Sequence, residues 1–247
     1  MTERPKFVTP KGRPPARRKP VAPGDLFVGV RPAAGPKTSY YDPECTQCPR
    51  LAEFLIETHH VHPDYFARPV PSFGAASPKI LIVGLAPGMH GANRTGRPFT
   101  GDYAGVLLYE TLHELGLATA SESVSADDGL ELRNARITNA VKCVPPENKP
   151  QPDEIKRCNG YLAGELAALK SVRVIFALGR IAHDGVLVAL GLKRSKFAFG
   201  HGAEHALDDK RVLVDSYHCS RYNTSTRVLT PEMFKKVMKR ACEIARV

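Results

Sequence analysis

Short apolar runs alternate with amphipathic stretches along most of this chain. Runs suited to buried parallel strands occur at residues 79–85, 135–141, 172–178 and 211–217. Stretches with the apolar spacing of helices lie at 51–58, 104–116, 153–170, 180–191 and 230–246. This alternation predicts an α/β fold of three layers (αβα) around a central, mostly parallel sheet of four strands.

A glycine-rich segment, GLAPGMHGANRTGRPFTGD, follows the first predicted strand over residues 84–102. It holds five glycines and two prolines together with polar side chains able to bind a ligand, and it is too long and polar for a simple connection. Polar positions also follow the other predicted strands, at Asn139, at Gly179 and Arg180, and over 218–227. Because the carboxyl ends of parallel strands share one edge of a sheet, these segments are expected to form one site.

The composition sets broad limits on the kind of protein. The chain has 247 residues, of which 43% are apolar and 24% charged, as in ordinary soluble proteins. No run approaches the roughly 20 apolar residues of a membrane span, and no apolar core of a signal peptide follows the charged start. We therefore expect a cytoplasmic monomer with no membrane partner, folded as a single domain over 25–247.

The first 24 residues differ from the rest of the chain. They carry seven Lys or Arg residues against the single acid Glu3, which accounts for +6 of the formal net charge of +10. With six prolines and few apolar residues, the segment 1–24 is predicted to be disordered. It could act as an electrostatic arm for nucleic acid or simply be a solvated tail, and the sequence leaves both interpretations open.

Four of the six cysteines are candidate metal ligands. Cys45 and Cys48 form a C-x2-C pair, and Cys143 and Cys158 lie far downstream with fourteen residues between them. Structural zinc usually takes two close pairs, whereas a [4Fe–4S] cluster tolerates irregular spacing of its four thiolates. The pattern leaves the cluster, zinc and no metal open, and a disulfide is disfavoured in a reducing compartment.

Three motifs, in this order, resemble those of a known family. They are GLAPGMHGANRTGRPFTGD at 84–102, ITNAVKCVPPENKP at 137–150 and HCSRYNTSTRVLT at 218–230. Together they resemble the uracil-DNA glycosylase superfamily, and within it the iron–sulfur enzymes of family five, over about residues 40–247. The resemblance implies a structural [4Fe–4S] cluster held by Cys45, Cys48, Cys143 and Cys158.

The resemblance also implies a function. Such an enzyme flips uracil, and other deaminated bases such as hypoxanthine, out of single- or double-stranded DNA. It then hydrolyses the N-glycosidic bond without a covalent enzyme intermediate and leaves an abasic site. Base removal requires extraction of the nucleotide, stabilisation of the anionic leaving group and support for a cationic sugar and the attacking water.

Two residues are the candidate catalytic groups. By resemblance His218 donates a hydrogen bond to O2 of the departing base. Relatives often place an acid or amide just after the first strand to orient the water, but that position here is Ala86, and proline often follows the histidine where this chain has Cys219. We therefore predict that Asp102 serves the water or the sugar cation; the alternative is that Asp102 caps the helix that follows it.

The remaining candidate residues fall into two groups. The base is expected to contact Leu85, Ala86, Gly88, His90, Phe99 and Asn139, with Phe99 stacking on it and the Asn139 amide reading its polar edge. DNA is expected to contact Asn93, Arg94, Arg97, Ser220, Arg221, Tyr222 and Asn223, the last four as a loop that enters the duplex.

Two other classes of function remain possible on the residues alone. A chain with Ala86 in place of an acid could be a non-catalytic nucleic-acid-binding module that retains the fold. If the cysteines held zinc, the chain could instead be a zinc-stabilised nucleotide hydrolase. Excision of uracil from an oligonucleotide would distinguish an enzyme from the non-catalytic module. Absorbance at about 400 nm would distinguish an iron–sulfur cluster from zinc.

Overall fold

The computed structural model describes residues 36–207 and 210–247, so the predicted tail 1–24 lies outside the described residues. One six-stranded sheet forms the centre, with the strands in the order β1-β3-β2-β4-β6-β5, and β1 (Phe73–Gly74) and β5 (Glu204–Ala206) lie at its edges. The four central strands are mutually parallel. They are β2 (Ile80–Gly84), β3 (Ala135–Asn139), β4 (Val174–Leu178) and β6 (Val212–Ser216). The predicted parallel sheet of four strands is confirmed as this central part.

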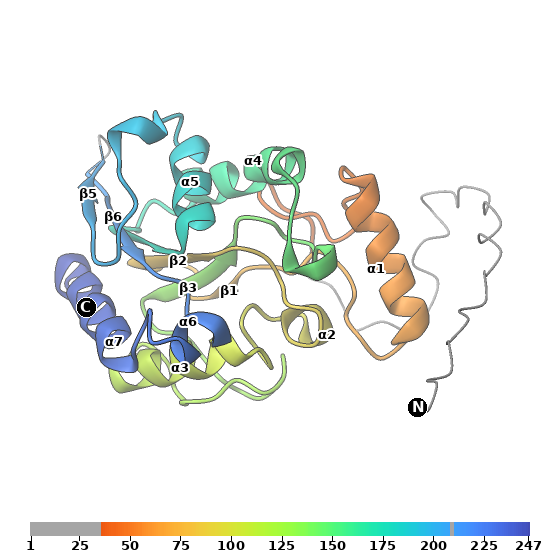
Figure 1. Cartoon of the computed structure of the whole chain (residues 1–247), viewed down its shortest axis with the longest axis horizontal. Coiled ribbons are helices and arrows are strands. Elements are labelled where there is room, and N and C mark those ends of the chain that lie inside the picture. The colour runs from red at the N-terminus through yellow and green to blue at the C-terminus, as the bar shows by residue number, and fades with distance from the viewer. Residues whose placement is uncertain (1–35, 208–209) are drawn as a thin grey trace, which may run out of the picture.

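The alternation of side chains along each strand explains the layers. Ile80 and Ile82 of β2 pack into one apolar cluster with α3 (Tyr103–Glu114) and α7 (Pro231–Ala245). Leu81 and Val83 pack into a second cluster with α4 (Pro152–Ala168) and α5 (Arg180–Ala189). Successive residues of a strand point to opposite faces, so a wholly apolar strand must be covered on both. Figure 1 shows α4 and α5 on one side of the sheet and α3 and α7 on the other. The three-layer α/β prediction is thereby confirmed.

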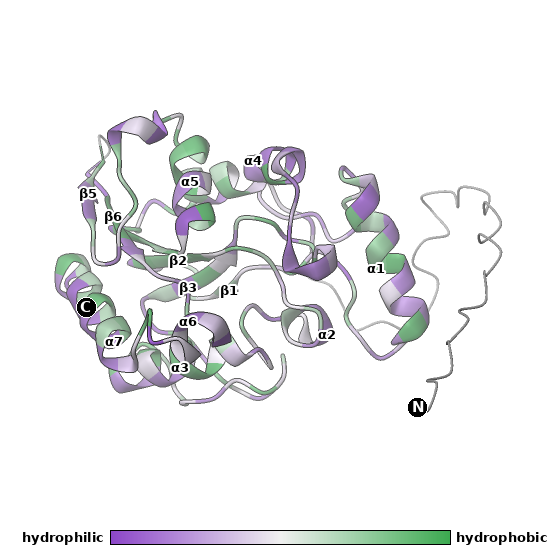
Figure 2. Ribbon diagram, in the orientation of Figure 1, coloured by the Kyte–Doolittle hydropathy of each residue, from purple (hydrophilic) through white to green (hydrophobic). Residues whose placement is uncertain are grey.

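The longer helices agree with the predicted ones to within a few residues. They are α1 (Pro49–Val61), α3 (Tyr103–Glu114), α4 (Pro152–Ala168), α5 (Arg180–Ala189) and α7 (Pro231–Ala245). The start of α7 is fixed by Thr230, whose hydroxyl accepts a hydrogen bond from the Met233 amide, with a proline at the first helical position. Hydrophobic and hydrophilic stretches alternate along α5 and α7 in Figure 2, as expected of helices with one buried face.

The elements that the sequence did not predict are all short. Two edge strands, β1 (Phe73–Gly74) and β5 (Glu204–Ala206), pair antiparallel with β3 and β6. The helices α2 (Ala92–Thr95) and α6 (Arg221–Ser225) lie inside the polar segments that follow β2 and β6. Over residues 36–207 and 210–247, no helix has both the length and the hydropathy to cross a membrane.

Candidate active site

A cleft of about 700 Å³ opens at the carboxyl edge of the parallel strands. It is lined by Leu85, Ala86, Gly88, Met89, His90, Phe99, Asp102, Tyr103, Ala104, Asn139, Asn148, His218, Ser220 and Arg221. The segments after β2, β3 and β6 thus meet as expected. The segment after β4 contributes less, because Arg180 instead lies over the Phe199 ring at 5.2 Å. Gly179 lies behind the cleft, against the Cβ of His218.

Gly84, the last residue of β2, allows two cleft residues to approach the strand. A Cβ on Gly84 would lie 2.7 Å from the Phe99 ring and would overlap the side-chain oxygen of Asn139. Any larger residue would therefore displace the ring that is expected to stack on a base and the amide that is expected to read it. The first glycine of the GLAP motif is required by this close approach rather than by a turn.

The Asn139 amide is buried with an unsatisfied acceptor. The residue is 3% exposed, and Oδ1 has no hydrogen-bond partner in the protein. A buried polar atom without a partner costs about 1–3 kcal/mol, so such an atom at a cleft wall indicates a ligand that supplies the missing donor. Asn139 is held by β3, a rigid strand, which suits it to recognise a planar ring edge.

Phe99 adopts a backbone conformation that is rare for a residue with a side chain. Its φ is +58°, in the left-handed region, which costs a non-glycine residue of order 1–3 kcal/mol. The conformation is held by tight packing, because a Cβ on Gly105 would overlap the Phe99 carbonyl oxygen. The ring faces His218 in a stacked arrangement with 6.1 Å between ring centroids. Phe99 and His218 therefore form one wall of the cleft.

Asp102 occupies the residue before α3 but does not cap that helix with its side chain. Its carboxylate turns back into the loop, where Oδ2 accepts a hydrogen bond of 3.1 Å from the Ala92 amide. A Cβ on Gly88 or on Gly91 would overlap the carboxylate, so both glycines make room for it. Burial raises the pKa of Asp102, while the amide donors oppose that rise. The positive charge of Arg94 also opposes the rise. The carboxylate lies at the cleft wall and, among the described residues, forms no ion pair.

His218 is the second titratable group of the cleft, and burial alone sets its charge. Burial lowers the pKa of His218 to about 4, so the imidazole is neutral at physiological pH. A neutral ring can donate one hydrogen bond from its protonated nitrogen. Its backbone carbonyl accepts a 2.8 Å hydrogen bond from Nδ2 of Asn223, which ties the residue to α6. Cys219 is wholly buried beneath it and does not line the cleft.

Two residues predicted to contact DNA lie in the interior instead. Arg97 is 5% exposed, and its guanidinium forms a 2.6 Å ion pair with Asp128 and a cation–π contact with Phe73 at 4.3 Å. Asn93 is fully buried in α2, where its Nδ2 lies 3.8 Å from the Met89 sulfur. Neither side chain can reach a phosphate, because both are enclosed by protein. The sequence does not distinguish such an arginine from its exposed neighbour Arg94.

The remaining predicted DNA contacts surround the mouth of the cleft. Arg94 is exposed and donates to the His90 carbonyl oxygen at 2.7 Å. Tyr222 is 74% exposed at the start of α6, and the Arg221 guanidinium lies 4.8 Å from the centroid of the Tyr103 ring. Ser220 caps α6 by accepting a hydrogen bond from the Asn223 amide. An exposed aromatic and two exposed cations therefore border the opening.

The four predicted metal ligands line a second, smaller pocket between α1 and α4. Cys48 directly precedes α1, and Cys45 lies three residues before Cys48. Cys143 follows β3, and Cys158 lies on α4. Burial, and then the neighbouring thiols, raise the pKa of Cys143 well above its ordinary value. Burial also raises the pKa of Cys158 to about 11, although the Lys142 amide donates a 3.3 Å hydrogen bond to its sulfur. Four thiolates could share this pocket only with a positively charged group among them.

The cleft also contains residues that the sequence did not suggest. Met89, Tyr103, Ala104 and Asn148 line it without having been predicted. Tyr103 follows Asp102 directly, so the start of the helical pattern could have suggested it. Asn148 comes from the proline-rich loop after Cys143 and adopts a φ of +57°. No periodicity signals that this loop turns back to the cleft.

Comparison with known proteins places this arrangement in a family. Residues 71–242 match the model of the uracil DNA glycosylase superfamily. The chain belongs to this superfamily. It is 48% identical over 207 residues to the type-5 uracil-DNA glycosylase of Thermus thermophilus, an alignment that covers 81% of this chain and 94% of that protein. The type-5 uracil-DNA glycosylase of Pyrobaculum aerophilum is 41% identical over 201 residues (80% and 87%), and that of Mycobacterium tuberculosis 41% over 209 residues (81% and 78%).

Proposed function

We propose that this chain is a DNA repair glycosylase that flips uracil out of DNA and hydrolyses its N-glycosidic bond, leaving an abasic site. The observation that carries this proposal is the convergence of Asp102, Asn139 and His218 from three loops on one cleft. These groups suit recognition of the extracted base, stabilisation of the leaving anion and support for the sugar cation and the water. The type-5 glycosylases with 41–48% identity support the same activity.

In the proposed complex the flipped base lies against Phe99 with its polar edge toward Asn139. The unpartnered Oδ1 of Asn139 accepts a hydrogen bond from the ring N–H that uracil has beside its carbonyl group. Aromatic stacking on a base contributes about 1–3 kcal/mol and tolerates different ring sizes. Arg94, Arg221 and Tyr222 at the mouth contact the DNA strand from which the base has left.

Hydrolysis then proceeds with water as the nucleophile. As the bond between C1′ and the base nitrogen breaks, the bonding electrons leave with the base, and neutral His218 donates a hydrogen bond to the developing anion at O2. Asp102 orients a water toward C1′ and accepts its proton as the new C–O bond forms. Lysine and cysteine are absent from the described residues that line the cleft, which supports hydrolysis without a covalent enzyme intermediate.

We further propose that the cleft accepts hypoxanthine as well as uracil. Both deaminated bases present an N–H next to a C=O, which is the pattern that an Asn139 amide can pair with. Ala86 lines the cleft with only a methyl group, so no polar side chain at that position restricts the size of the ring. The cleft of about 700 Å³ leaves room for a purine.

The cysteine pocket supports a [4Fe–4S] cluster held by Cys45, Cys48, Cys143 and Cys158. The four residues come from the segment before α1, the loop after β3 and α4, and they line one pocket. Four thiolates at irregular spacing are a ligand set that holds such a cluster. The cluster would join α1 and α4 and supply the positive charge that the thiolates need; it takes no step in base removal. Iron and acid-labile sulfide analysis of the purified protein tests this assignment.

Excision is tested on a labelled oligonucleotide with a single uracil, followed by alkali cleavage of abasic sites. We expect cleavage at the uracil by the wild-type chain, in single strands and in duplexes, and at hypoxanthine in a parallel substrate. Borohydride should trap no covalent complex. Tight binding of the uracil oligonucleotide without cleavage would instead establish the non-catalytic binding module.

A further inference from the structure

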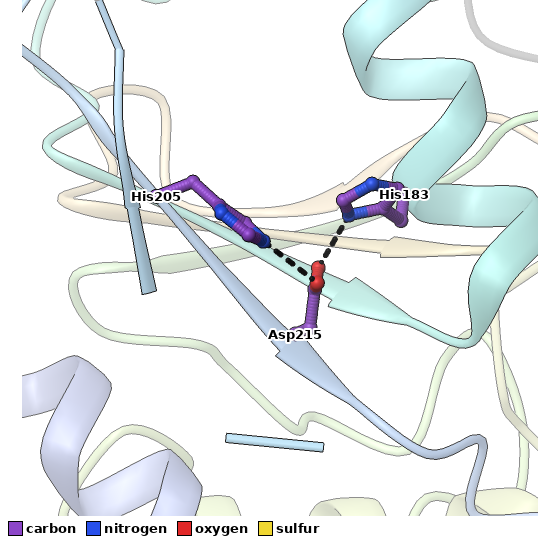
Figure 3. A group of neighbouring side chains, drawn as sticks. All are labelled: His183, His205 and Asp215. Atoms are coloured by element: carbon purple, nitrogen blue, oxygen red, sulfur yellow. Dashed lines mark hydrogen bonds and ion pairs between the residues drawn. The ribbon is translucent and has the colours of Figure 1, made fainter. Parts of the chain in front are cut away.

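Three metal-ligating side chains meet on the α5 face of the sheet, outside the cleft and the cysteine pocket. His183 comes from α5, His205 from β5 and Asp215 from β6. One ligand atom from each lies within 4.8 Å of the other two. Figure 3 shows both imidazole rings directed at the Asp215 carboxylate. We propose that these three residues bind a divalent transition metal ion of the zinc class.

Each imidazole ring contacts a different oxygen of the Asp215 carboxylate. Nδ1 of His183 lies 2.8 Å from Oδ1 of Asp215, and Nε2 of His205 lies 3.2 Å from Oδ2. His183 and Asp215 are fully buried, whereas the His205 side chain is 14% exposed. Two imidazoles and a carboxylate are a common ligand set for zinc, and the partly exposed ring provides a route for the ion and for a water as fourth ligand.

A backbone contact of Nε2 orients the His183 ring so that Nδ1 faces Asp215. Nε2 lies 3.1 Å from the Phe197 carbonyl oxygen, which can only accept a hydrogen bond, so Nε2 carries the proton. A hydrogen bond from the distal nitrogen to a backbone carbonyl is what orients most metal-bound histidines. Nδ1 is then the nitrogen that faces the Asp215 oxygen, at a distance that suits either a shared proton or a metal ion bound by both atoms.

Charge explains why a metal ion suits this position. Asp215 is fully buried, and its carboxylate carries a negative charge that favours a positive group beside it. Leaving such a charge unpaired in the interior is costly, and a divalent ion would offset it. Nitrogen ligands select zinc and similar ions over magnesium and calcium, which prefer oxygen.

The position suggests a structural ion rather than a catalytic one. The three residues do not line the cleft, but Asp215 lies near the end of β6, three residues before His218. The Asp215 amide also donates to the Ala203 carbonyl oxygen at 2.9 Å. A metal ion here would fasten α5 and the β5–β6 edge behind the strand that positions His218.

Zinc binding by the purified, cluster-containing protein tests this inference. The wild type is treated with EDTA, incubated with zinc chloride and passed through a desalting column; zinc and iron are then measured separately. We expect about one zinc per chain in the wild type, and a loss of more than about tenfold in zinc affinity for His205→Gln and Asp215→Asn. Zinc should also raise the melting temperature of the wild type but not that of His205→Gln.

His113→Gln is the matched control, because His113 lies exposed on α3 far from the three ligands in sequence. It should bind zinc as the wild type does. Zinc captured by vacant cysteines would persist in His205→Gln, so the difference between wild type and this variant isolates the proposed site. Equal zinc in the two proteins would overturn the inference and leave a proton between His183 and Asp215. Neither result depends on glycosylase activity.

Discussion

Two partly buried aspartates near the same loop are held in opposite ways. Asp128 pairs with Arg97 at 2.6 Å and accepts backbone hydrogen bonds from Val124 and Leu130. Burial opposes its ionisation, but these donors lower the pKa of Asp128 to about 2. Asp102 also accepts backbone hydrogen bonds, but burial dominates and its pKa is raised. The two carboxylates therefore differ in their contacts. Asp128 forms an ion pair with Arg97, whereas the more distant charge of Arg94 does not outweigh the burial of Asp102.

This difference supports the proposed catalytic role of Asp102 and a structural role for Asp128. The ion pair of Asp128 leaves its oxygens no capacity for chemistry and fixes the loop that carries Phe99. Asp102 lines the cleft, where loss of water around its carboxylate makes the charged form less favourable. Gly88 and Gly91 lie so close to this carboxylate that neither position has room for a side chain. Perturbed titratable groups in a cleft are typical of catalytic sites, and Asp102 fits that description where Asp128 does not.

Replacing each aspartate by asparagine should give the largest and most different effects. Asp102→Asn should lower the single-turnover rate of uracil excision by about 10³-fold with little change in melting temperature, because the water loses its proton acceptor. Asp128→Asn should lower the free energy of unfolding by about 3 kcal/mol, because buried Arg97 loses its counter-charge. Its rate per folded molecule should stay near that of the wild type. The assignment fails if the two variants exchange these effects.

The pH dependence of excision should give the next largest effect. Asp102 must be ionised to serve the water, and its pKa is raised above 3.8. His218, with a pKa of about 4, is neutral at physiological pH and adds no limb there. The rate should therefore fall about tenfold per unit as pH drops below the pKa of Asp102 and stay level above it. Single-turnover rates show this limb in the wild type; a rate that rises with acidity would indicate a protonated His218 as the acid.

A smaller effect should follow when the space around Asp102 is filled. In Gly91→Ala the new methyl group overlaps the carboxylate and must displace it. A shift of about 1 Å in a catalytic group can reduce the rate roughly 10²-fold. Gly160→Ala is the matched control, because a Cβ at this position in α4 meets no atom within 4 Å. Stopped or quenched assays should find Gly160→Ala as active as the wild type; equal loss in both variants would contradict the close fit.

The sequence predicted those parts of the molecule that follow from periodicity. The apolar runs predicted the strands that carry Asn139 and His218, and parallel topology predicted that their ends would meet. It could not predict the edge strands β1 and β5, which span two and three residues and have no period to detect. It also could not place Arg97, because burial of an arginine depends on a partner, Asp128, thirty-one residues away.

The same limit applied to Asp102. A carboxylate before a helix reads as an N-cap, since aspartate is favoured there. Only the folded loop shows that the side chain turns back from α3 into the space left by Gly88 and Gly91. The motif resemblance suggested a role in catalysis, but the physical reason for it lies in contacts between residues that no helical or strand spacing relates.

The smallest expected effect concerns specificity at Ala86, which lines the cleft beside the proposed base site. Ala86→Asp places a second carboxylate in the cleft, where it narrows the space for a purine and repels Asp102. We expect the ratio of uracil to hypoxanthine excision to rise about tenfold, the range of roughly 1–3 kcal/mol by which shape alone discriminates substrates. Ala86→Val separates size from charge, because it fills the space without a carboxylate. Identical ratios in wild type and Ala86→Asp would show that selectivity resides at Asn139 and not at the first residues after β2.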